Sequence, residues 1–304
     1  MVVSVVVTNR CNYSCGYCDR WDGRGEQMAP EELAAYLDEM AAMGTRRVIF
    51  TGGEPLVRKD LLERLDQAVA LGMKVQLNTN GVLVPRFLER LGALASMMVS
   101  IDGDLPTHDR VRGPGAYDAA AEAIRVMRRA HPHVRVRISA TMSSESLGAE
   151  DALLDLAREL GVTVFFQPAE HRQLGGEGSN ALAPPTARYR DAIDHLLLEK
   201  RRGAPIQNSA SALAYLRGWP DAPALPCAGA KLFCRLDHDA RVMICGRMGE
   251  YEESHSARDG GFRRAFLSLH EAKCPTCWCA SRVEVNQAFA LRPDALLGLA
   301  TAAT

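Results

Sequence analysis

Apolar residues along the first half of the chain follow two alternating periods. Short runs rich in Val, Ile, Leu and Met are separated by longer stretches in which apolar residues recur every three or four positions. The first longer stretch begins at Pro30, ends before Gly44 and has the spacing of a helix with one apolar face. The pattern predicts strands over residues 2–8, 47–50, 74–79, 97–101, 134–140 and 162–167, and further helices over residues 60–71, 85–91, 117–129 and 149–160.

Strands that alternate with helices in this way are typical of a parallel sheet with right-handed crossovers. A closed eight-unit barrel needs about 250 residues, whereas the alternation here stops near residue 167. The sequence therefore predicts the α/β class, with an open, partial (β/α)6 barrel of the TIM type. Parallel strands present functional residues at their carboxyl ends. The residues of interest at such ends are Cys11, Gly52, Asn80, Ser100 and Gln167.

Composition narrows the function classes. The chain has 304 residues, is 47% hydrophobic and carries a formal net charge of −1, with basic and acidic residues intermixed. We expect no nucleic-acid partner, because no basic face is visible, and no membrane span, because no apolar run approaches about 20 residues. Residues 1–7 are apolar but lack a basic start, so they indicate a strand and not a signal peptide. A cytoplasmic protein of unknown oligomeric state is expected.

The cysteines are spaced like metal ligands. There are nine, an odd number in a large chain, which favours a reducing compartment and metal ligation over disulfides. Cys11, Cys15 and Cys18 have the spacing Cys-x3-Cys-x2-Cys. Three thiolates can hold three irons of a [4Fe–4S] cluster and leave the fourth iron open to chelate a small molecule. A zinc knuckle is the alternative, but it needs a fourth nearby Cys or His, and the next one is His108.

This cysteine loop, with Tyr17 before its third cysteine, resembles the signature of the radical S-adenosylmethionine (SAM) enzymes. The resemblance implies that the open iron binds the amino and carboxylate groups of SAM, with Tyr17 near the adenine. One electron then cleaves SAM to methionine and a 5′-deoxyadenosyl radical, which takes a hydrogen atom from a C–H bond. A flavodoxin or ferredoxin-type reductant is expected to supply that electron. A second family mark is Gly52-Gly53-Glu54-Pro55, which in the family meets the amino group of the methionine.

Further segments are similar to parts of the family's cofactor site. Residues 100–103 and Arg112 resemble segments near the SAM ribose and carboxylate, although a turn and a surface arginine explain them equally well. Thr141 could line the adenine pocket or serve as a plain core residue. The candidate cofactor-binding residues are Tyr17, Gly52, Gly53, Glu54, Pro55, Asn80, Ser100, Asp102, Arg112 and Thr141.

A polar group follows the last predicted strand. Glu170, His171 and Arg172 come shortly after Gln167 and could contact a polar substrate or serve as acid and base, or could form a solvated loop. Residues 173–183 are rich in Gly, Ser and Asn and indicate a loop or lid. A helix is predicted over residues 185–201, and we place the boundary of the barrel region, 1–202, after it.

A second group of cysteines lies in the C-terminal region, residues 203–304, which is expected to form a small iron–sulfur extension of a β-hairpin plus a helix. A β-hairpin with its turn at residues 237–240 is expected to bring Cys245 back towards Cys227, and Cys274 and Cys277 form a Cys-x2-Cys pair. Four such thiolates can hold an iron–sulfur cluster, although a zinc ribbon uses the same residue types. The arrangement is similar to the twitch extension, a short form of the SPASM domain, which implies one auxiliary [4Fe–4S] cluster. Ala240 stands where the family hairpin usually has Gly.

Two thiols, Cys234 and Cys279, remain, unless they exchange roles with Cys245 and Cys277. They are either small buried apolar residues or donors that return a hydrogen atom to a substrate radical. The second reading, with the resemblance, predicts redox-neutral epimerisation of a small polar natural product such as a sugar, aminoglycoside or aminocyclitol in antibiotic biosynthesis. The alternatives are dehydrogenation of an alcohol with the auxiliary cluster as electron acceptor, maturation of a ribosomal peptide, and a non-catalytic zinc protein.

Overall fold

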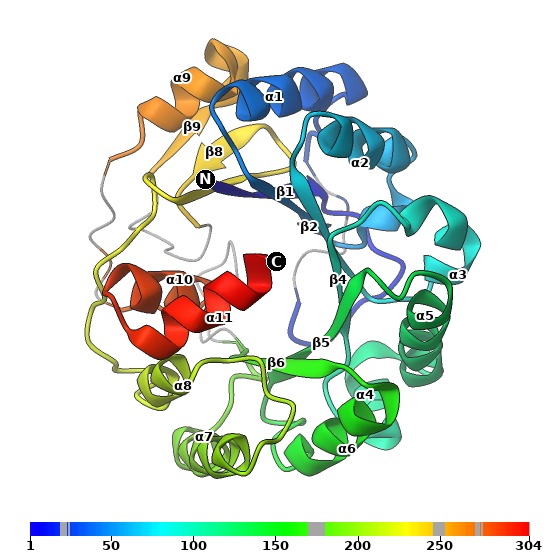
Figure 1. Cartoon of the computed structure of the whole chain (residues 1–304), viewed down its shortest axis with the longest axis vertical. Helices are drawn as coiled ribbons and strands as arrows, with labels where there is room; N and C mark the ends of the chain where they lie inside the picture. The colour runs from blue at the N-terminus through cyan, green and yellow to red at the C-terminus, as the bar shows by residue number, and fades with distance from the viewer. Residues whose placement is uncertain are drawn as a thin grey trace.

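The computed structural model is an open barrel of strands surrounded by helices (Figure 1). It describes residues 1–18, 23, 25–169, 180–245, 253–270, 274 and 276–303, with side chains described up to residue 298. Within this part of the chain one sheet has nine strands in the order β6-β5-β4-β3-β2-β1-β7-β8-β9. None of the described helices is long and apolar enough to cross a membrane.

The barrel region alternates strands and helices as predicted. Neighbouring strands from β1 to β6 pair in parallel, in chain order. The predicted open, partial (β/α)6 barrel is therefore confirmed. Its elements are β1 (Val2–Thr8), α1 (Pro30–Ala42), β2 (Arg47–Gly52), η1 (Pro55–Val57), α2 (Leu61–Ala70), β3 (Lys74–Thr79), α3 (Val84–Phe87), η2 (Leu88–Leu91), β4 (Ser96–Ser100), α4 (Leu105–Arg112), α5 (Ala116–Ala130), β5 (Arg135–Met142), α6 (Glu150–Leu160) and β6 (Thr163–Pro168).

Two helices of the barrel region differ from the prediction. The segment expected as one helix over residues 85–91 is a single α turn, α3, followed by the 3-10 turn η2. Helix α4 was not predicted, because only His108 and Val111 of its residues are buried and the segment shows no apolar period. It begins at Asp104, whose side chain accepts a hydrogen bond from the Thr107 amide at 3.2 Å.

The C-terminal elements extend the same sheet. They are α7 (Thr186–Arg201), α8 (Ala210–Leu216), β7 (Phe233–Leu236), β8 (Arg241–Met243), β9 (Ser254–Ser256), η4 (Ala257–Asp259), α9 (Gly261–Leu267), α10 (Ala280–Phe289) and α11 (Pro293–Ala303). The predicted hairpin is present, and its first strand, β7, pairs in parallel with β1. Ala240 adopts the left-handed φ of +67° that the turn requires, so the hairpin forms without Gly. The division of the chain at residue 202 stays a prediction.

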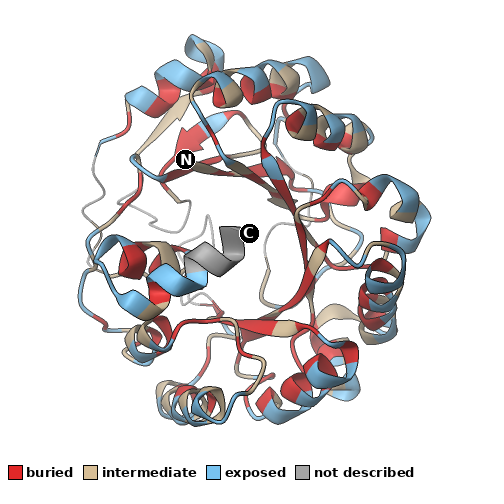
Figure 2. Cartoon of the chain, in the orientation of Figure 1, coloured by how far each residue is buried: buried red, intermediate tan, exposed pale blue. Residues whose placement is uncertain are grey.

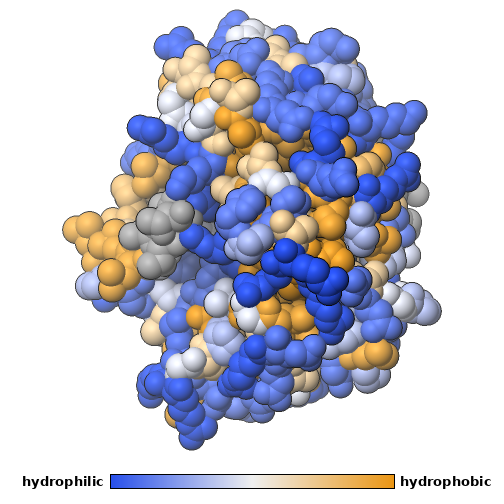
Figure 3. Space-filling model, turned by 45° about the vertical axis from the view of Figure 1, so that its right-hand side comes forward, coloured by the Kyte–Doolittle hydropathy of each residue, from blue (hydrophilic) through white to orange (hydrophobic). Residues whose placement is uncertain are grey.

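The core lies between the sheet and the outer helices (Figure 2). Successive side chains of a strand point to opposite faces. In β1, Val3, Val5 and Val7 are fully buried towards the helices, whereas Ser4 and Val6 face the inside of the barrel. The face seen in Figure 3 is mostly hydrophilic, with apolar areas between the hydrophilic ones.

Helix α10 fills the open side of the barrel. The sheet order ends at β6 on one side and continues through β7 on the other, and α10 lies between β6 and β8 in Figure 1. A separate buried cluster joins Phe165 of β6 to Ala280 and Val283 of α10. The face of α10 that carries Ser281 and Arg282 is thereby turned into the barrel.

Candidate active site

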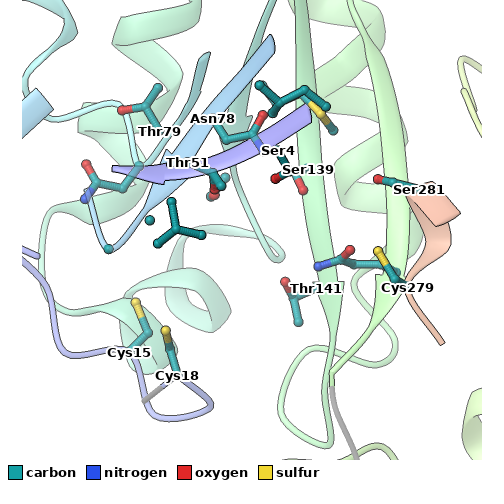
Figure 4. A pocket seen from close by; sticks show the side chains of 18 of the residues that line it. Ser4, Cys15, Cys18, Thr51, Asn78, Thr79, Ser139, Thr141, Cys279 and Ser281 are labelled. Carbon is teal, nitrogen blue, oxygen red and sulfur yellow. The ribbon is translucent and has the colours of Figure 1, made fainter. Parts of the chain in front are cut away.

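A cavity of about 340 Å³ lies inside the barrel and opens at the carboxyl ends of its strands (Figure 4). This volume falls in the range of about 300–1,000 Å³ that is usual for small-molecule sites. Hydroxyl and amide side chains supply much of its wall. Those labelled in Figure 4 are Ser4, Thr51, Asn78, Thr79, Ser139, Thr141 and Ser281, which come from β1, β2, β3, β5 and α10.

The cysteine loop forms the mouth of the cavity. Cys11, Cys15 and Cys18 all line it, and Figure 4 shows the last two side by side. One hydrogen bond ties the loop to α4, from the Gly16 amide to the Val111 carbonyl at 3.2 Å, and another lies within the loop, from the Cys18 amide to the Cys15 carbonyl at 3.0 Å. All three thiols thus border the same cavity, and their joint ligation of one cluster stays a prediction.

The two glycines of the Gly52-Gly53-Glu54-Pro55 motif tie β2 to the start of this loop. Gly52 has a φ of +152°, and a Cβ there would stand 2.2 Å from the Thr8 carbonyl oxygen. The Gly53 amide donates to that same oxygen at 2.8 Å, and the Glu54 amide donates to the Arg10 carbonyl at 2.9 Å. Only Gly allows this approach, which sets the position of the chain just before Cys11.

Glu54 and Pro55 lie behind the cavity wall and not in it. The Glu54 carboxylate is fully buried and accepts hydrogen bonds from the Leu56 amide (3.1 Å), the Thr79 hydroxyl (2.9 Å) and the Asn80 amide (2.8 Å). Burial raises the pKa of Glu54 to about 7 despite these donors. The side chain therefore positions the end of β3, and it is Asn80, not Glu54, that faces the cavity.

Asp102, Arg112 and Tyr17 form a buried network at one side of the mouth. Arg112 Nε donates to Asp102 Oδ2 at 2.6 Å, Arg112 Nη2 donates to Asp102 Oδ1 at 3.2 Å, and Tyr17 Oη donates to Asp102 Oδ2 at 2.9 Å. Arg112 Nη2 also donates to Tyr17 Oη. The Asp102 side chain is 0% exposed and that of Arg112 is 9% exposed, so the alternative of a surface arginine is wrong.

Electrostatics keep this network charged. Burial alone would raise the pKa of Asp102, but the charge and hydrogen bonds of Arg112 outweigh it and hold that pKa below its ordinary value. Asp102 also accepts from the Thr141 amide at 2.9 Å, which links the ends of β4 and β5. His108 accepts from the Asp102 amide at 3.0 Å, and burial followed by the nearby Arg112 lowers its pKa to about 4. The histidine is therefore neutral near pH 7.

Five of the six C-terminal thiols lie near one another, and two of them, Cys245 and Cys279, line the cavity. Burial is the largest cause that raises the pKa of Cys277, followed by the charges of Cys279, Cys245, Cys274 and Cys227. Asn286 ties the group together: its Oδ1 accepts from the Ala228 amide at 2.9 Å, and its Nδ2 donates to Cys277 Sγ at 3.8 Å.

The donors are thiols, a ligand type that iron–sulfur clusters and zinc both accept. In the described residues no three His, Cys, Asp or Glu side chains are grouped to hold one metal ion. Four thiolates on one zinc would lie within about 4 Å of each other, since Zn–S bonds are about 2.3 Å. Thiolates of a [4Fe–4S] cube bind separate irons and are spaced further apart.

Comparison with known proteins decides the family. The model of the radical SAM superfamily matches residues 5–165, which is more than half of the chain. This chain belongs to the radical SAM superfamily. It is a radical SAM enzyme, and a [4Fe–4S] cluster and SAM are its cofactors.

Similar proteins belong to several enzyme groups. An AdoMet-dependent heme synthase of Methanosarcina barkeri is 31% identical over 275 residues, which cover 79% of this chain and 75% of that protein. The mycofactocin maturase MftC of Mycolicibacterium smegmatis is 25% identical over 272 residues, which cover 86% of this chain and 68% of the maturase. The crystal structure of Streptococcus suis SuiB bound to S-adenosylmethionine has a TM-score of 0.71 at 15% identity, with 88% of this chain and 65% of SuiB covered. That likeness shows the fold alone.

In this radical SAM enzyme the two leftover thiols have different surroundings. Cys279 lines the cavity, as does Cys245 (Figure 4 labels Cys279). Cys234 is 0% exposed, lies in the main apolar core and alternates with Arg235, which faces the cavity. Cys234 therefore packs on the helix side of the sheet, away from the cavity.

Several lining residues were missed by the sequence analysis. Ser4, Gln76, Asn78 and Ser139 alternate with apolar neighbours on their strands, and that alternation could have indicated an inward polar face. Arg282 could not be found this way, because no helix was predicted over residues 280–289. Ser100, Gln167 and Thr141 do line the cavity, whereas Asp102 acts through Arg112 and Tyr17. Glu170, His171 and Arg172 lie outside the described residues.

Proposed function

We propose that this radical SAM enzyme inverts a carbon centre of a substrate held between the cysteine loop and α10, with Cys279 as the hydrogen-atom donor. The observation that carries the proposal is the position of Cys279, a thiol at the cavity wall that a four-cysteine auxiliary cluster does not need. Cys227, Cys245, Cys274 and Cys277 are the proposed ligands of that cluster.

The residues at the mouth have distinct tasks in this proposal. Cys11, Cys15 and Cys18 would hold the first cluster, which together with SAM supplies a carbon radical that removes a substrate hydrogen atom. Asn80 and the backbone of Gly52 and Gly53 border the same space and would orient the methionine part of SAM. Tyr17, which is held by Asp102 and Arg112, would border the adenine.

The return of hydrogen from Cys279 balances the reaction. A substrate C–H bond breaks as the C–H bond of 5′-deoxyadenosine forms. The S–H bond of Cys279 then breaks as a new substrate C–H bond forms on the opposite face. The resulting sulfur radical needs one electron and one proton before the next turnover, and a flavodoxin or ferredoxin-type reductant would supply the electron. The substrate undergoes no net redox change.

Turnover in D2O tests this proposal. The reconstituted enzyme would be given SAM and reductant with a short peptide, a tetrapyrrole or an aminocyclitol in turn. We expect one deuterium at the inverted carbon of the accepted substrate, because a thiol proton exchanges with solvent. Cys279→Ala should still form 5′-deoxyadenosine but no inverted product, and Cys234→Ala should behave as the wild type. Inverted product from Cys279→Ala would refute the donor assignment.

Oxidative modification of a peptide is the second candidate. Two observations favour it: relatives are maturases, and Cys245, a proposed auxiliary-cluster ligand, lines the cavity and could bring an electron acceptor close to the substrate. In that case the product loses two hydrogen atoms, gains no deuterium, and is formed equally well by Cys279→Ala. The sugar and aminoglycoside substrates expected from the sequence have no counterpart among the relatives described above.

A further inference from the structure

Among the described residues, the cavity wall has guanidinium side chains and no carboxylate. Of the described residues that line it, three are arginines, Arg112, Arg235 and Arg282, and none is Asp or Glu. A charge in such an enclosed place is costly unless an opposite charge lies beside it. An arginine of this wall that has no carboxylate partner in the protein would therefore favour a negatively charged ligand.

Two of the three are neutralised by residues behind the wall. Arg112 pairs with Asp102 at 2.6 Å, and Arg235 pairs with Asp237. Arg282 forms no ion pair with any described residue. Among the described residues, Arg282 Nη2 donates to the Cys234 carbonyl at 3.5 Å, and Arg282 Cζ lies 4.1 Å from the centroid of the Phe233 ring. With a relative exposure of 8%, Arg282 is more than nine-tenths buried.

The position of Arg282 relates it to the proposed donor. It lies three residues after Cys279, so the two residues are one turn apart on the first turn of α10. The amino end of a helix adds further positive potential at this point. The Phe233 ring beneath Arg282 belongs to the first residue of β7, which pairs with Val2 at the start of β1. The guanidinium therefore lies deep in the barrel, whereas the Cys11–Cys18 loop follows the end of β1.

We infer that Arg282 is the anion-binding residue of the substrate site and that the substrate carries a carboxylate. This inference rests on the proposed function in one respect, namely that the molecule bound in the cavity is the substrate. The binding of an anion by Arg282 does not depend on whether Cys279 donates a hydrogen atom. A guanidinium offers several N–H donors in a plane, which suits a carboxylate better than a hydroxyl or an ammonium group. A carboxylate held there places the neighbouring carbons one helical turn below Cys279.

Dicarboxylate binding tests this inference on the cluster-loaded enzyme without SAM. Glutarate should raise the thermal midpoint, whereas neutral glutaramide should not, since only the carboxylate completes the ion pair. A rise of about 2 °C is expected when glutarate exceeds its dissociation constant tenfold. Arg282→Gln should abolish the rise. Arg292→Gln, which removes an equal charge from an exposed site beyond α10, should keep it. An equal response to glutarate in wild type and Arg282→Gln overturns the inference.

Alkylation of Cys279 provides a second readout. The alkylation rate of Cys279 with iodoacetate is divided by its rate with iodoacetamide. Both reagents attack the same thiolate, so the ratio does not depend on the fraction of thiol that is ionised. It reports only how strongly the site attracts the negatively charged reagent. In Arg282→Gln this ratio should fall about tenfold, which corresponds to about 1.4 kcal/mol, and Arg282→Lys should recover part of it. If Arg282 instead balances the auxiliary cluster, Arg282→Gln will lower the reduction potential of that cluster and leave the ratio unchanged, which also overturns the inference. The D2O experiment with Cys279→Ala does not depend on either result.

Discussion

The ion pair of Asp102 and Arg112 allows a sharp test of how burial sets the strength of a contact. Both Arg112 N–H groups facing Asp102 lie at hydrogen-bond distance, 2.6 and 3.2 Å, and neither side chain is more than 9% exposed. Asp102→Asn keeps the shape but leaves the Arg112 charge buried without a counter-charge. Removing one partner of a buried pair costs about 3–5 kcal/mol.

The expected size of the effect lies near the lower end of this range. Asn at position 102 can still accept a hydrogen bond from the Thr141 amide, which Asp102 accepts now at 2.9 Å. A loss of about 3 kcal/mol with a urea slope of about 3 kcal/mol/M moves the unfolding midpoint by about 1 M. Anaerobic urea unfolding of the cluster-free chain, followed by circular dichroism, measures this shift.

The chain contains a matched control for the same geometry at the surface. Arg217 and Asp194 form a bidentate pair with distances of 2.6 and 2.8 Å, but their side chains are 48% and 49% exposed. Solvent screens such a pair and keeps either partner hydrated after the other is removed. Asp194→Asn should therefore leave the midpoint nearly unchanged. Equal midpoint shifts in the two variants would refute the argument from burial.

The pH dependence gives an independent check. Because the folded pKa of Asp102 is lowered, its contribution to stability is present above the unfolded value of about 3.9 and is lost as the pH falls through the folded value. The difference between wild type and Asp102→Asn should therefore stay constant from pH 8 to pH 5 and shrink only in stronger acid. A difference that changes between pH 5 and pH 8 would mean that another group carries the effect.

Three further predictions concern residues in and around the cavity wall. Gly52→Ala should lower the free energy of unfolding by about 3 kcal/mol and reduce iron binding at the first cluster site, because its Cβ would stand 2.2 Å from the Thr8 oxygen. Gly72→Ala is the control: Gly72 has a φ of +80° with open space around it, so this variant should lose only about 1 kcal/mol. The wild type should lose stability as the pH rises towards the folded pKa of Glu54, about 7, since burial favours the protonated carboxyl. Glu54→Gln should remove this loss. The same dependence of unfolding free energy on pH in both proteins, from pH 5 to pH 8, would contradict this. Asn286→Asp should lower iron from about eight to about four per chain, since a carboxylate repels the Cys277 thiolate that the amide now contacts at 3.8 Å; full iron content in this variant rules out that role.

Local rules explain why much of the barrel was predictable. In α5, which the pattern predicts over residues 117–129, the apolar residues at helical spacing are buried, namely Ala120, Ala123, Ile124 and Met127. Gly161 ends α6 in the left-handed conformation, as its position after the helix predicts. Where the pattern failed, as in α4, the helix is set by its Asp104 cap and by its two buried residues, and no apolar period marks it.

The amino-acid sequence by itself determined the parallel sheet, the cysteine loop and the hairpin, because each depends on periodicity or spacing within a short segment. Only the tertiary structure decided that α10 closes the open side of the barrel, that Cys279 and not Cys234 reaches the cavity, and that no described carboxylate pairs with Arg282. The tertiary structure also places the Glu54 side chain behind the cavity wall, where it accepts three hydrogen bonds. These outcomes depend on how helices and strands that are far apart in the chain pack against each other. The spacing of residues within a single segment does not specify that packing.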